Sequence, residues 1–135
     1  MNIATDKNRQ KILIVDDDEF LLHLYSEKFQ KAGFEVEVIT SSDKALEKLR
    51  AGFRPDVLLL DIVMPGMDGV ELLSEIRKEK LAEPAAVIFL TNQSAHDDLE
   101  RAKHLNIAGY IVKASSIPSE VLNEVREISK KYHGK

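Results

Sequence analysis

Acidic side chains follow the most apolar segments of this sequence. Four acidic residues, at positions 16–19, come directly after the apolar run at residues 11–15, and Asp61 follows the apolar run at residues 56–60. A buried charge costs free energy unless it is paired or bound to a metal ion. Carboxylates placed at the ends of buried segments therefore indicate a site for chemistry, with cation binding as the simplest case.

The elements that carry these side chains can be predicted from hydrophobic periodicity. The runs at residues 11–15, 56–60 and 85–90 are continuously apolar, which is typical of strands covered on both faces. The run at residues 34–39 alternates valine with glutamate, which is typical of an edge strand with one wet face. A fifth apolar run, at residues 109–112, predicts the last strand.

Helical patterns lie between these runs and after the last one. In the stretches at residues 18–32 and 42–51, apolar residues recur on one face and a glycine follows the last turn. Three further helices are predicted, starting near residues 68, 94 and 116. The expected N-terminal caps are Asp18, Ser41 or Ser42, Asp68 with Glu71 as capping-box partner, Ser94, and Ser115 or Ser116 followed by Pro118.

Strands that alternate with helices of this length predict crossover units, and therefore an α/β fold with a parallel sheet. We expect the domain to cover residues 10–132, with a flexible N-terminus at 1–9, a C-terminal tail at 133–135 and no output domain. The expected strand ends then fall at one edge of the sheet, because all strands of a parallel sheet point the same way.

Length and composition exclude several classes of protein. The chain has 135 residues, of which 44% are hydrophobic and 31% charged, as in an ordinary single globular domain. Its net charge of −4 argues against a nucleic-acid-binding surface, and no apolar run approaches the roughly 20 residues of a membrane span. The chain has no cysteine, and its first residues lack the apolar core of a signal peptide. We therefore expect a cytoplasmic protein without direct nucleic-acid or membrane contacts.

The shared edge would gather Asp16, Asp17, Asp61, Thr91 and Lys113. Two carboxylates ~4 Å apart repel by ~4 kcal/mol at an effective dielectric near 20, and one lysine offsets only part of such a cluster. Either one acid is protonated or a cation binds. Oxygen ligands of this kind suit Mg²⁺, which in turn recruits phosphate oxygens. This arrangement suits phosphoryl transfer, in which a carboxylate can act as nucleophile and form an acyl phosphate.

Four motifs resemble those of the receiver domains of two-component response regulators, and the resemblance covers roughly residues 10–130. It implies a flavodoxin-like, doubly wound parallel sheet of five strands in the order 2-1-3-4-5, with five helices. The periodicity alone predicts the alternation and the parallel sheet but not that order. The matching segments are ILIVDDDE (12–19), LLLDIVMPGMDG (58–69), VIFLTN (87–92) and GYIVK (109–113).

The resemblance implies a role for each acid. Asp61 would accept a phosphoryl group from a sensor histidine kinase or a histidine phosphotransfer protein. Asp17 and Asp61 would bind Mg²⁺ directly, Asp16 would act through water, and the backbone carbonyl of Val63 would complete the protein ligands. Mn²⁺ is the alternative ion.

The resemblance also implies a conformational switch. Thr91 and Lys113 would contact the phosphoryl group, and Tyr110 would change rotamer together with Thr91. The surface formed by the fourth helix, the fifth strand and the fifth helix would then change as a population shift, and a downstream protein of unknown identity would bind it. Such a protein is a monomer or weak dimer and not an enzyme in the usual sense, since it assists only its own phosphorylation and dephosphorylation.

Four positions bear on the rate of that chemistry. Val63, Asn92 and Gln93 flank the site where the family tunes the attack of water, and the apolar Val63 favours slow self-dephosphorylation. Asn92 stands where the family usually has alanine or glycine, so we expect altered phosphorylation or dephosphorylation rates. Ala114 follows the lysine where the family usually has proline. A cis bond there costs ~3 kcal/mol, which favours a trans loop.

Two other functions remain open from the sequence. One is a phosphohydrolase of the haloacid-dehalogenase type with Asp16 as nucleophile, although the chain is short and lacks a cap segment for that class. The other is a receiver-like binding module that does not use phosphate. Three residues are also interpreted structurally: Asp18 as the cap of the first helix, Asp68 as a helix cap, and Gly69 as a tight-turn residue.

Overall fold

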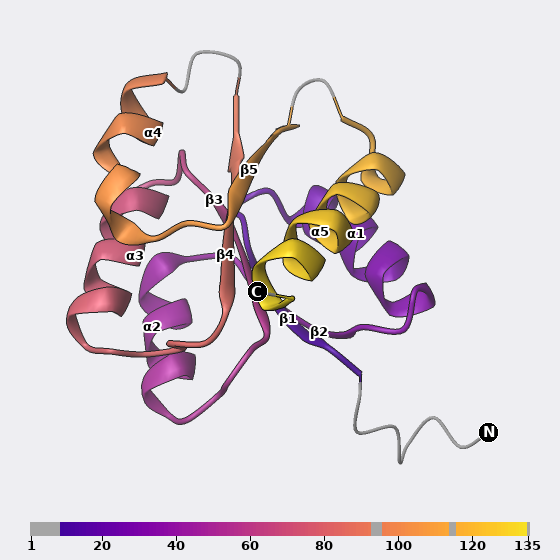
Figure 1. Cartoon of the computed structure of the whole chain (residues 1–135), viewed down its shortest axis with the longest axis horizontal. Coiled ribbons are helices and arrows are strands. Elements are labelled where there is room, and N and C mark those ends of the chain that lie inside the picture. Colours follow the sequence, from indigo (N-terminus) through magenta and orange to yellow (C-terminus); the bar gives the residue numbers. More distant parts are fainter. Residues whose placement is uncertain (1–8, 93–95, 114–115, 135) are drawn as a thin grey trace.

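The computed structural model describes residues 9–92, 96–113 and 116–134. Within these ranges five strands and five α-helices alternate along the chain (Figure 1). They are β1 Lys11–Val15, α1 Glu19–Lys31, β2 Glu35–Ile39, α2 Ser42–Arg50, β3 Val57–Asp61, α3 Gly69–Lys78, β4 Ala86–Thr91, α4 His96–Arg101, the 3₁₀ turn η2 Lys103–Leu105, β5 Gly109–Val112 and α5 Pro118–His133.

The strands form one parallel sheet in the order β2-β1-β3-β4-β5. This confirms the predicted α/β class and the order that the family resemblance implied. The edge position predicted for β2 is also confirmed, and Val38 on that strand is 41% exposed. All five residues of the central strand β3 are buried, including Asp61, which belongs to the strand rather than following it.

Helices cover both faces of the sheet, with α1 and α5 on one face and α2 and α3 on the other (Figure 1). Alternate residues of β1 point to opposite faces, so that Leu13 and Val15 pack with α2 and α3 while Ile12 and Ile14 pack with α1 and α5. The two cores hold the strands rigidly, and the strand ends therefore have fixed relative positions.

Most predicted caps are confirmed. The side chains of Asp18, Ser41 and Asp68 accept the backbone N–H groups that begin α1, α2 and α3. The predicted cap of α5 is wrong for Ser116, because the helix is capped at Ile117, whose N–H is accepted by the carboxylate of Glu120 at 3.0 Å. The predicted caps Ser94 and Ser115 lie outside the described residues.

The ends of the domain differ slightly from the expected bounds. Helix α5 continues through His133. Arg9, expected in the flexible N-terminus, donates from Nε to the carbonyl of Gly33 and from Nη2 to that of Phe34, each at 3.3 Å. The rest of that expected segment lies outside the described residues. Within the described ranges, no helix combines the length and hydropathy that crossing a bilayer requires.

Candidate functional site

Three carboxylates gather at the carboxyl edge of the sheet. Asp16 and Asp17 follow β1, and Asp61 ends the neighbouring strand β3. Each offers an oxygen, and these oxygens lie within 4.8 Å of one another. Asp16 is 0% exposed and Asp61 is 5% exposed, whereas Asp17 is open to solvent. The structure therefore brings together the three acids that the strand-end argument predicted.

Lys113 supplies the positive charge at this cluster. Its Nζ lies 2.8 Å from Oδ2 of Asp16 and donates to Oδ2 of Asp61 at 3.2 Å. Burial of the ammonium lowers the pKa of Lys113, but the neighbouring carboxylates of Asp16 and Asp61 outweigh burial, so that the pKa is raised. Lys113 therefore stays charged, and one ammonium faces three carboxylates.

This imbalance changes the protonation of Asp61. Burial, and then the charge of Asp16, raise the pKa of Asp61 to about 7, although Lys113 opposes both. Near neutral pH a large share of the metal-free molecules would hold a proton on this carboxyl group. A bound divalent cation would displace that proton, because metal ligands must be deprotonated.

The donor set fits Mg²⁺. Oδ1 of Asp16 accepts the N–H of Asp18 at 2.9 Å, and its buried Oδ2 faces the ammonium of Lys113 at 2.8 Å. Because Lys113 is shared with Asp61, this one ammonium leaves a net negative charge among the three carboxylates, which is costly unless a further cation binds. Two buried carboxylates and one exposed carboxylate provide the hard oxygen ligands that Mg²⁺ prefers. Val63, the fourth predicted ligand, lies two residues beyond β3 and its side chain is 59% exposed.

The remaining predicted residues lie on β4 and β5. Thr91 ends β4, is 2% exposed, and its hydroxyl donates to the carbonyl of Ile111 at a long 3.5 Å. Tyr110 on β5 is 51% exposed, so its side chain points away from the core. Asn92 follows Thr91 and is exposed. Gln93 lies outside the described residues.

Ala114, where a trans loop was predicted, also lies outside the described residues. The backbone around Lys113 is therefore described only up to the lysine itself. No cis peptide bond occurs in the described parts of the chain.

Gly69 has a structural role that the sequence interpretation missed. It does not adopt a positive φ, unlike Gly66 in the same loop at +73°, so the tight-turn interpretation of Gly69 is wrong. Instead the first turn of α3 lies directly on the backbone of the acid site. A Cβ at position 69 would overlap the carbonyl oxygen of Asp61 and lie 2.9 Å from Cα of Ile62. Its N–H donates to the carbonyl of Ile62 at 2.8 Å.

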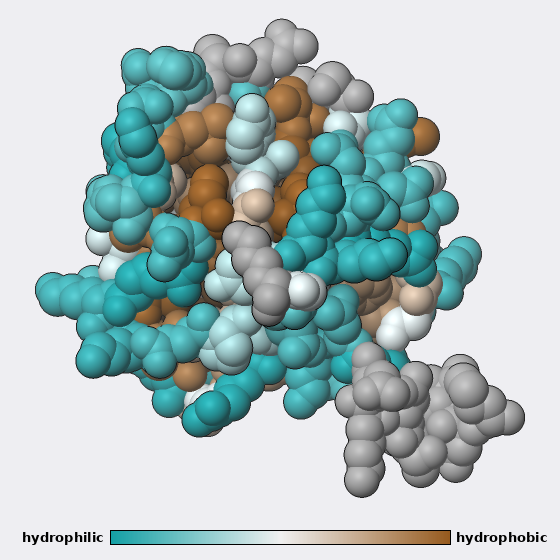
Figure 2. All heavy atoms as spheres, viewed as in Figure 1, coloured by the Kyte–Doolittle hydropathy of each residue, from teal (hydrophilic) through white to brown (hydrophobic). Residues whose placement is uncertain are grey.

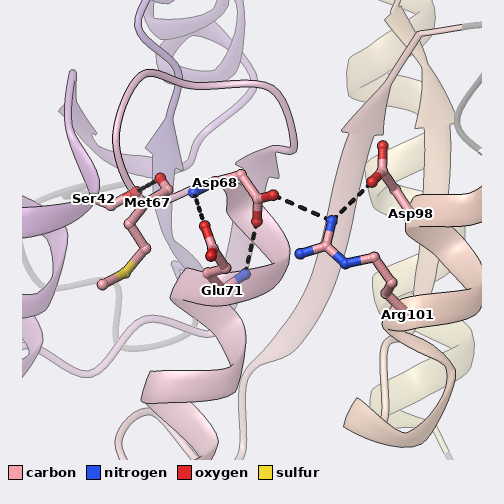
Figure 3. A network of polar contacts seen from close by, with 6 residues as sticks. All are labelled: Ser42, Met67, Asp68, Glu71, Asp98 and Arg101. Atoms are coloured by element: carbon pink, nitrogen blue, oxygen red, sulfur yellow. Dashed lines mark hydrogen bonds and ion pairs between the residues drawn. The ribbon is translucent and has the colours of Figure 1, made fainter.

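A second missed feature is a polar network around the cap of α3 (Figure 3). Asp68 accepts the N–H of Glu71 at 2.8 Å, and its own N–H donates to Oε1 of Glu71 at 2.9 Å. Its free carboxylate oxygen lies 3.2 Å from Nη1 of Arg101, at the end of α4. The capping box was predictable from Asp68 and Glu71, but no local signal links Arg101 to them.

The fold and the acid cluster match what the family resemblance implied, and the sequence comparison agrees. Residues 12–126 match the response regulator receiver domain family. The chain therefore belongs to this family of two-component signalling modules, whose members are phosphorylated on aspartate and typically use Mg²⁺ at an acidic pocket.

Several relatives share this domain. The chain is 34% identical to sporulation initiation phosphotransferase F of Bacillus subtilis, over 91% of this chain and 93% of that protein. It is 31% identical to the alkaline phosphatase synthesis transcriptional regulatory protein PhoP of the same organism, over 88% of this chain. It covers only 48% of PhoP, and it likewise spans about half the length of several other matched transcriptional regulators.

Solved structures agree with the fold. The chemotaxis response regulator CheY4 of Vibrio cholerae superposes with a TM-score of 0.80 at 27% identity, covering 90% of this chain and 99% of that one. A CheY-like receiver domain protein from Methanospirillum hungatei gives a TM-score of 0.82 at 26% identity, covering 94% of this chain and 98% of that one.

Proposed function

We propose that this chain is a receiver that accepts a phosphoryl group on Asp61 from a histidine kinase or a histidine phosphotransfer protein, with Mg²⁺ bound by Asp16, Asp17, Asp61 and the carbonyl of Val63. The observation that carries the proposal is the convergence of three carboxylate oxygens within 4.8 Å beside the ammonium of Lys113. Mn²⁺ would serve as the alternative ion. The similarity to a phosphotransferase over nearly its whole length supports the same assignment.

The chain's own residues account for the transfer step. An oxygen of ionised Asp61 attacks the phosphorus of a phosphohistidine, so that a P–O bond forms, the P–N bond breaks and the imidazole leaves with the electron pair and takes up a proton. Lys113, 3.2 Å from Oδ2 of Asp61, would pair with a phosphoryl oxygen. Asp16 holds Lys113 in place at 2.8 Å. When bound, Mg²⁺ would neutralise charge on the transferred group.

The phosphoryl group would then change the packing around Thr91. It adds roughly two negative charges beside a cluster that is already acidic. The hydroxyl of Thr91 is held only by a long 3.5 Å contact to Ile111, so it can exchange that acceptor for a phosphoryl oxygen. Tyr110, exposed on the next strand, would turn inward into the space that Thr91 leaves. Val63, Asn92 and Gln93 would set how fast water removes the group.

The surface that would report this change is formed by α4, β5 and α5. Apolar side chains gather over the β5 region in Figure 2, between the polar surfaces of α4 and α5. We propose that a downstream protein binds here and that the chain acts in the cytoplasm as a monomer or weak dimer. It would assist its own phosphorylation and dephosphorylation without turning over a separate substrate.

Three exposed apolar side chains suit the docking of the phosphodonor. Phe20 is 71% exposed at the start of α1, Val63 is 59% exposed after β3, and Ile117 is 61% exposed before α5. Each belongs to a segment that follows a strand at the acidic edge. A partner that brings a histidine to Asp61 would bury these side chains, and a helical kinase or phosphotransfer domain would do so.

Intact-mass measurement tests the proposal. Incubation with acetyl phosphate and Mg²⁺ should add one phosphoryl group, which hydroxylamine removes. Asp61→Asn should abolish the label, whereas Asp43→Asn, a control at an exposed acid on α2, should keep it. A label on Asp16 would indicate the phosphohydrolase instead. No label from acetyl phosphate or from a histidine kinase would indicate a module that does not use phosphate.

A further inference from the structure

A polar contact joins helices α3 and α4. Arg101, the last residue of α4, places Nη1 3.2 Å from Oδ2 of Asp68, the cap of α3 (Figure 3). The same nitrogen lies 2.9 Å from Oδ1 of Asp98, one turn back on α4. The pair with Asp98 stays within α4, so the Arg101–Asp68 pair, which we call the α3–α4 contact, is the part that crosses between helices.

Among the described residues, few buried side chains hold helix α4. It spans six residues, and none of them is buried. Leu99 is its partly buried apolar side chain, and the buried anchors, Ala102 and Leu105, come only after its end. Elements with few buried apolar side chains open at low free energy. Even a weak charged contact at its last residue can therefore bias where α4 lies.

The other partner of the contact leads directly to the acid site. Asp68 is followed by Gly69, which lies against the backbone of Asp61 and Ile62. The opposite end of α4 connects through the segment after β4 to Thr91, the predicted phosphoryl contact. Arg101 thus ties the end of α4 to the loop between Asp61 and α3, at the end of α4 away from Thr91.

We infer that the α3–α4 contact holds α4 in its unphosphorylated position and that phosphorylation of Asp61 releases it. The inference rests on the proposed function, because the release requires the phosphoryl group. Because α4 follows Thr91 closely in the chain, movement of Thr91 toward that group would shift α4 relative to α3 and lengthen the 3.2 Å contact. A contact made in only one of two packings biases the equilibrium between them.

The first arm of the test needs no phosphorylation. Hydrogen–deuterium exchange is measured for the α4 amides in the full chain with Mg²⁺. Arg101→Gln should speed their exchange about two- to fivefold, the range expected for an exposed ion pair. Arg101→Lys should restore slow exchange, because it keeps the charge. Asp68→Asn should also speed the exchange, though by no more than Arg101→Gln, since asparagine still caps α3 and cannot form the ion pair with the guanidinium, while the pair with Asp98 stays.

Two controls separate the contact from its neighbours. Asp98→Asn removes only the pair within α4 and should have a smaller effect than Asp68→Asn. Arg50→Gln breaks a surface ion pair between α2 and the end of α3, at Glu79, and should leave α4 exchange unchanged. Equal exchange in Arg101→Gln, Arg50→Gln and the unaltered protein would overturn the inference.

The second arm repeats the measurement after phosphorylation by acetyl phosphate. Exchange of α4 in the unaltered protein should rise, and its difference from Arg101→Gln should disappear. Arg101→Gln should also gain the phosphoryl group about two- to fivefold faster, because the contact no longer opposes the second packing. A difference that persists after Asp61 is fully phosphorylated would overturn the release.

The two proposals fail in different ways. If Asp61 cannot be labelled in any variant, the proposed function falls and the release falls with it, while the first arm still decides whether Arg101 holds α4. If Asp61 is labelled and the α4 exchange never responds to Arg101, the receiver function stands and the role of the α3–α4 contact is refuted.

Discussion

Charged side chains lie at both ends of the parallel strands, the amino edge and the carboxyl edge of the sheet, and their pairing differs between the two. At the amino edge, Asp56 accepts the N–H of Lys11 at 2.8 Å, and the pair of Arg50 and Glu79 lies at the surface. At the carboxyl edge, Asp16 and Asp61 are buried around the ammonium of Lys113. Asp56, Arg50 and Glu79 thus find partners within the fold, whereas the carboxyl edge keeps an excess of negative charge.

The difference shows that the acid cluster cannot be explained as a stabilising feature. Surface ion pairs such as Arg50–Glu79 contribute little to the free energy of folding, and their formation requires little desolvation. Buried carboxylates that share one cation cost free energy, because desolvation and mutual repulsion exceed what one lysine returns. A fold that keeps such a cluster uses it for binding.

The largest effect is expected from Lys113→Ala. Removing the ammonium leaves Asp16 and Asp61 without their cation and should lower the free energy of unfolding of the metal-free protein by about 2–4 kcal/mol. Urea unfolding in the presence of a chelator measures it. The control is Lys103→Ala, because Lys103 pairs with Glu100 at 3.6 Å on an exposed surface, and its loss should cost about 0.5 kcal/mol or less. Similar costs for both variants would remove the contrast.

The second-largest effect is expected from Gly69→Ala. Its Cβ would overlap the carbonyl of Asp61, and relieving such a clash costs about 1–3 kcal/mol. Because the backbone of Asp61 must shift, Mg²⁺ affinity should fall as well. Gly52→Ala, at the amino edge, meets no atom within 4 Å but has a φ of +106°, so it should lose about 1 kcal/mol and leave Mg²⁺ affinity unchanged. Unchanged metal affinity in Gly69→Ala would refute the positioning role.

The third prediction concerns pH in the absence of metal. The pKa of Asp61 is raised from 3.8 to about 7, so between these values the folded protein binds more protons at this site than the unfolded chain. The contribution of Asp61 to the free energy of unfolding is therefore fully present below pH 3.8 and is lost as the pH rises through about 7. Unfolding curves measured from pH 4 to 8 should show this loss, and Asp61→Asn or saturating Mg²⁺ should flatten it. A metal-free protein without this slope would contradict the assigned pKa.

The smallest effect belongs to the amino edge. Hydrogen bonds that Arg50 donates to Glu79 lower the pKa of Glu79 from 4.5 to about 2. The pH dependence of stability from Glu79 is opposite to that from Asp61. The contribution of Glu79 to the free energy of unfolding is present above pH 4.5 and is lost as the pH falls through about 2. Arg50→Gln should abolish this acid-side slope while changing stability at neutral pH less than Lys113→Ala or Gly69→Ala does. A larger loss at neutral pH than in Lys113→Ala would reverse the comparison of the two edges.

Much of the fold could be predicted because the signals are local. Buried parallel strands are continuous apolar runs, and the alternation of Val36 and Val38 with glutamates marked the edge strand. Asp18 and Asp68 cap helices because a short carboxylate reaches the first free N–H groups. Local signals do not predict the strand order, because crossovers of similar length are compatible with several orders. The order was predicted from the family resemblance instead.

The site was predictable only where strand direction decides position. Asp16 and Asp61 converge because neighbouring parallel strands end at the same edge. The roles of Gly69 and Arg101 depend instead on how closely α3 packs against β3 and on where α4 lies. Hydrophobic periodicity predicts neither of these. The cap at Ile117 was missed for a related reason, because Glu120 accepts the N–H there and no capping side chain of its own is needed.

Acids at the ends of β1 and β3 should jointly hold one divalent ion, and metal binding measures this. Calorimetric titration of the metal-free protein with Mg²⁺ should give one ion per chain. Asp17→Asn should weaken it at least ~10-fold, while Asp18→Asn, which alters the next acid but keeps the cap of α1, should bind as the unaltered protein does. Equal affinities in the two variants, or no binding at all, would contradict the claim.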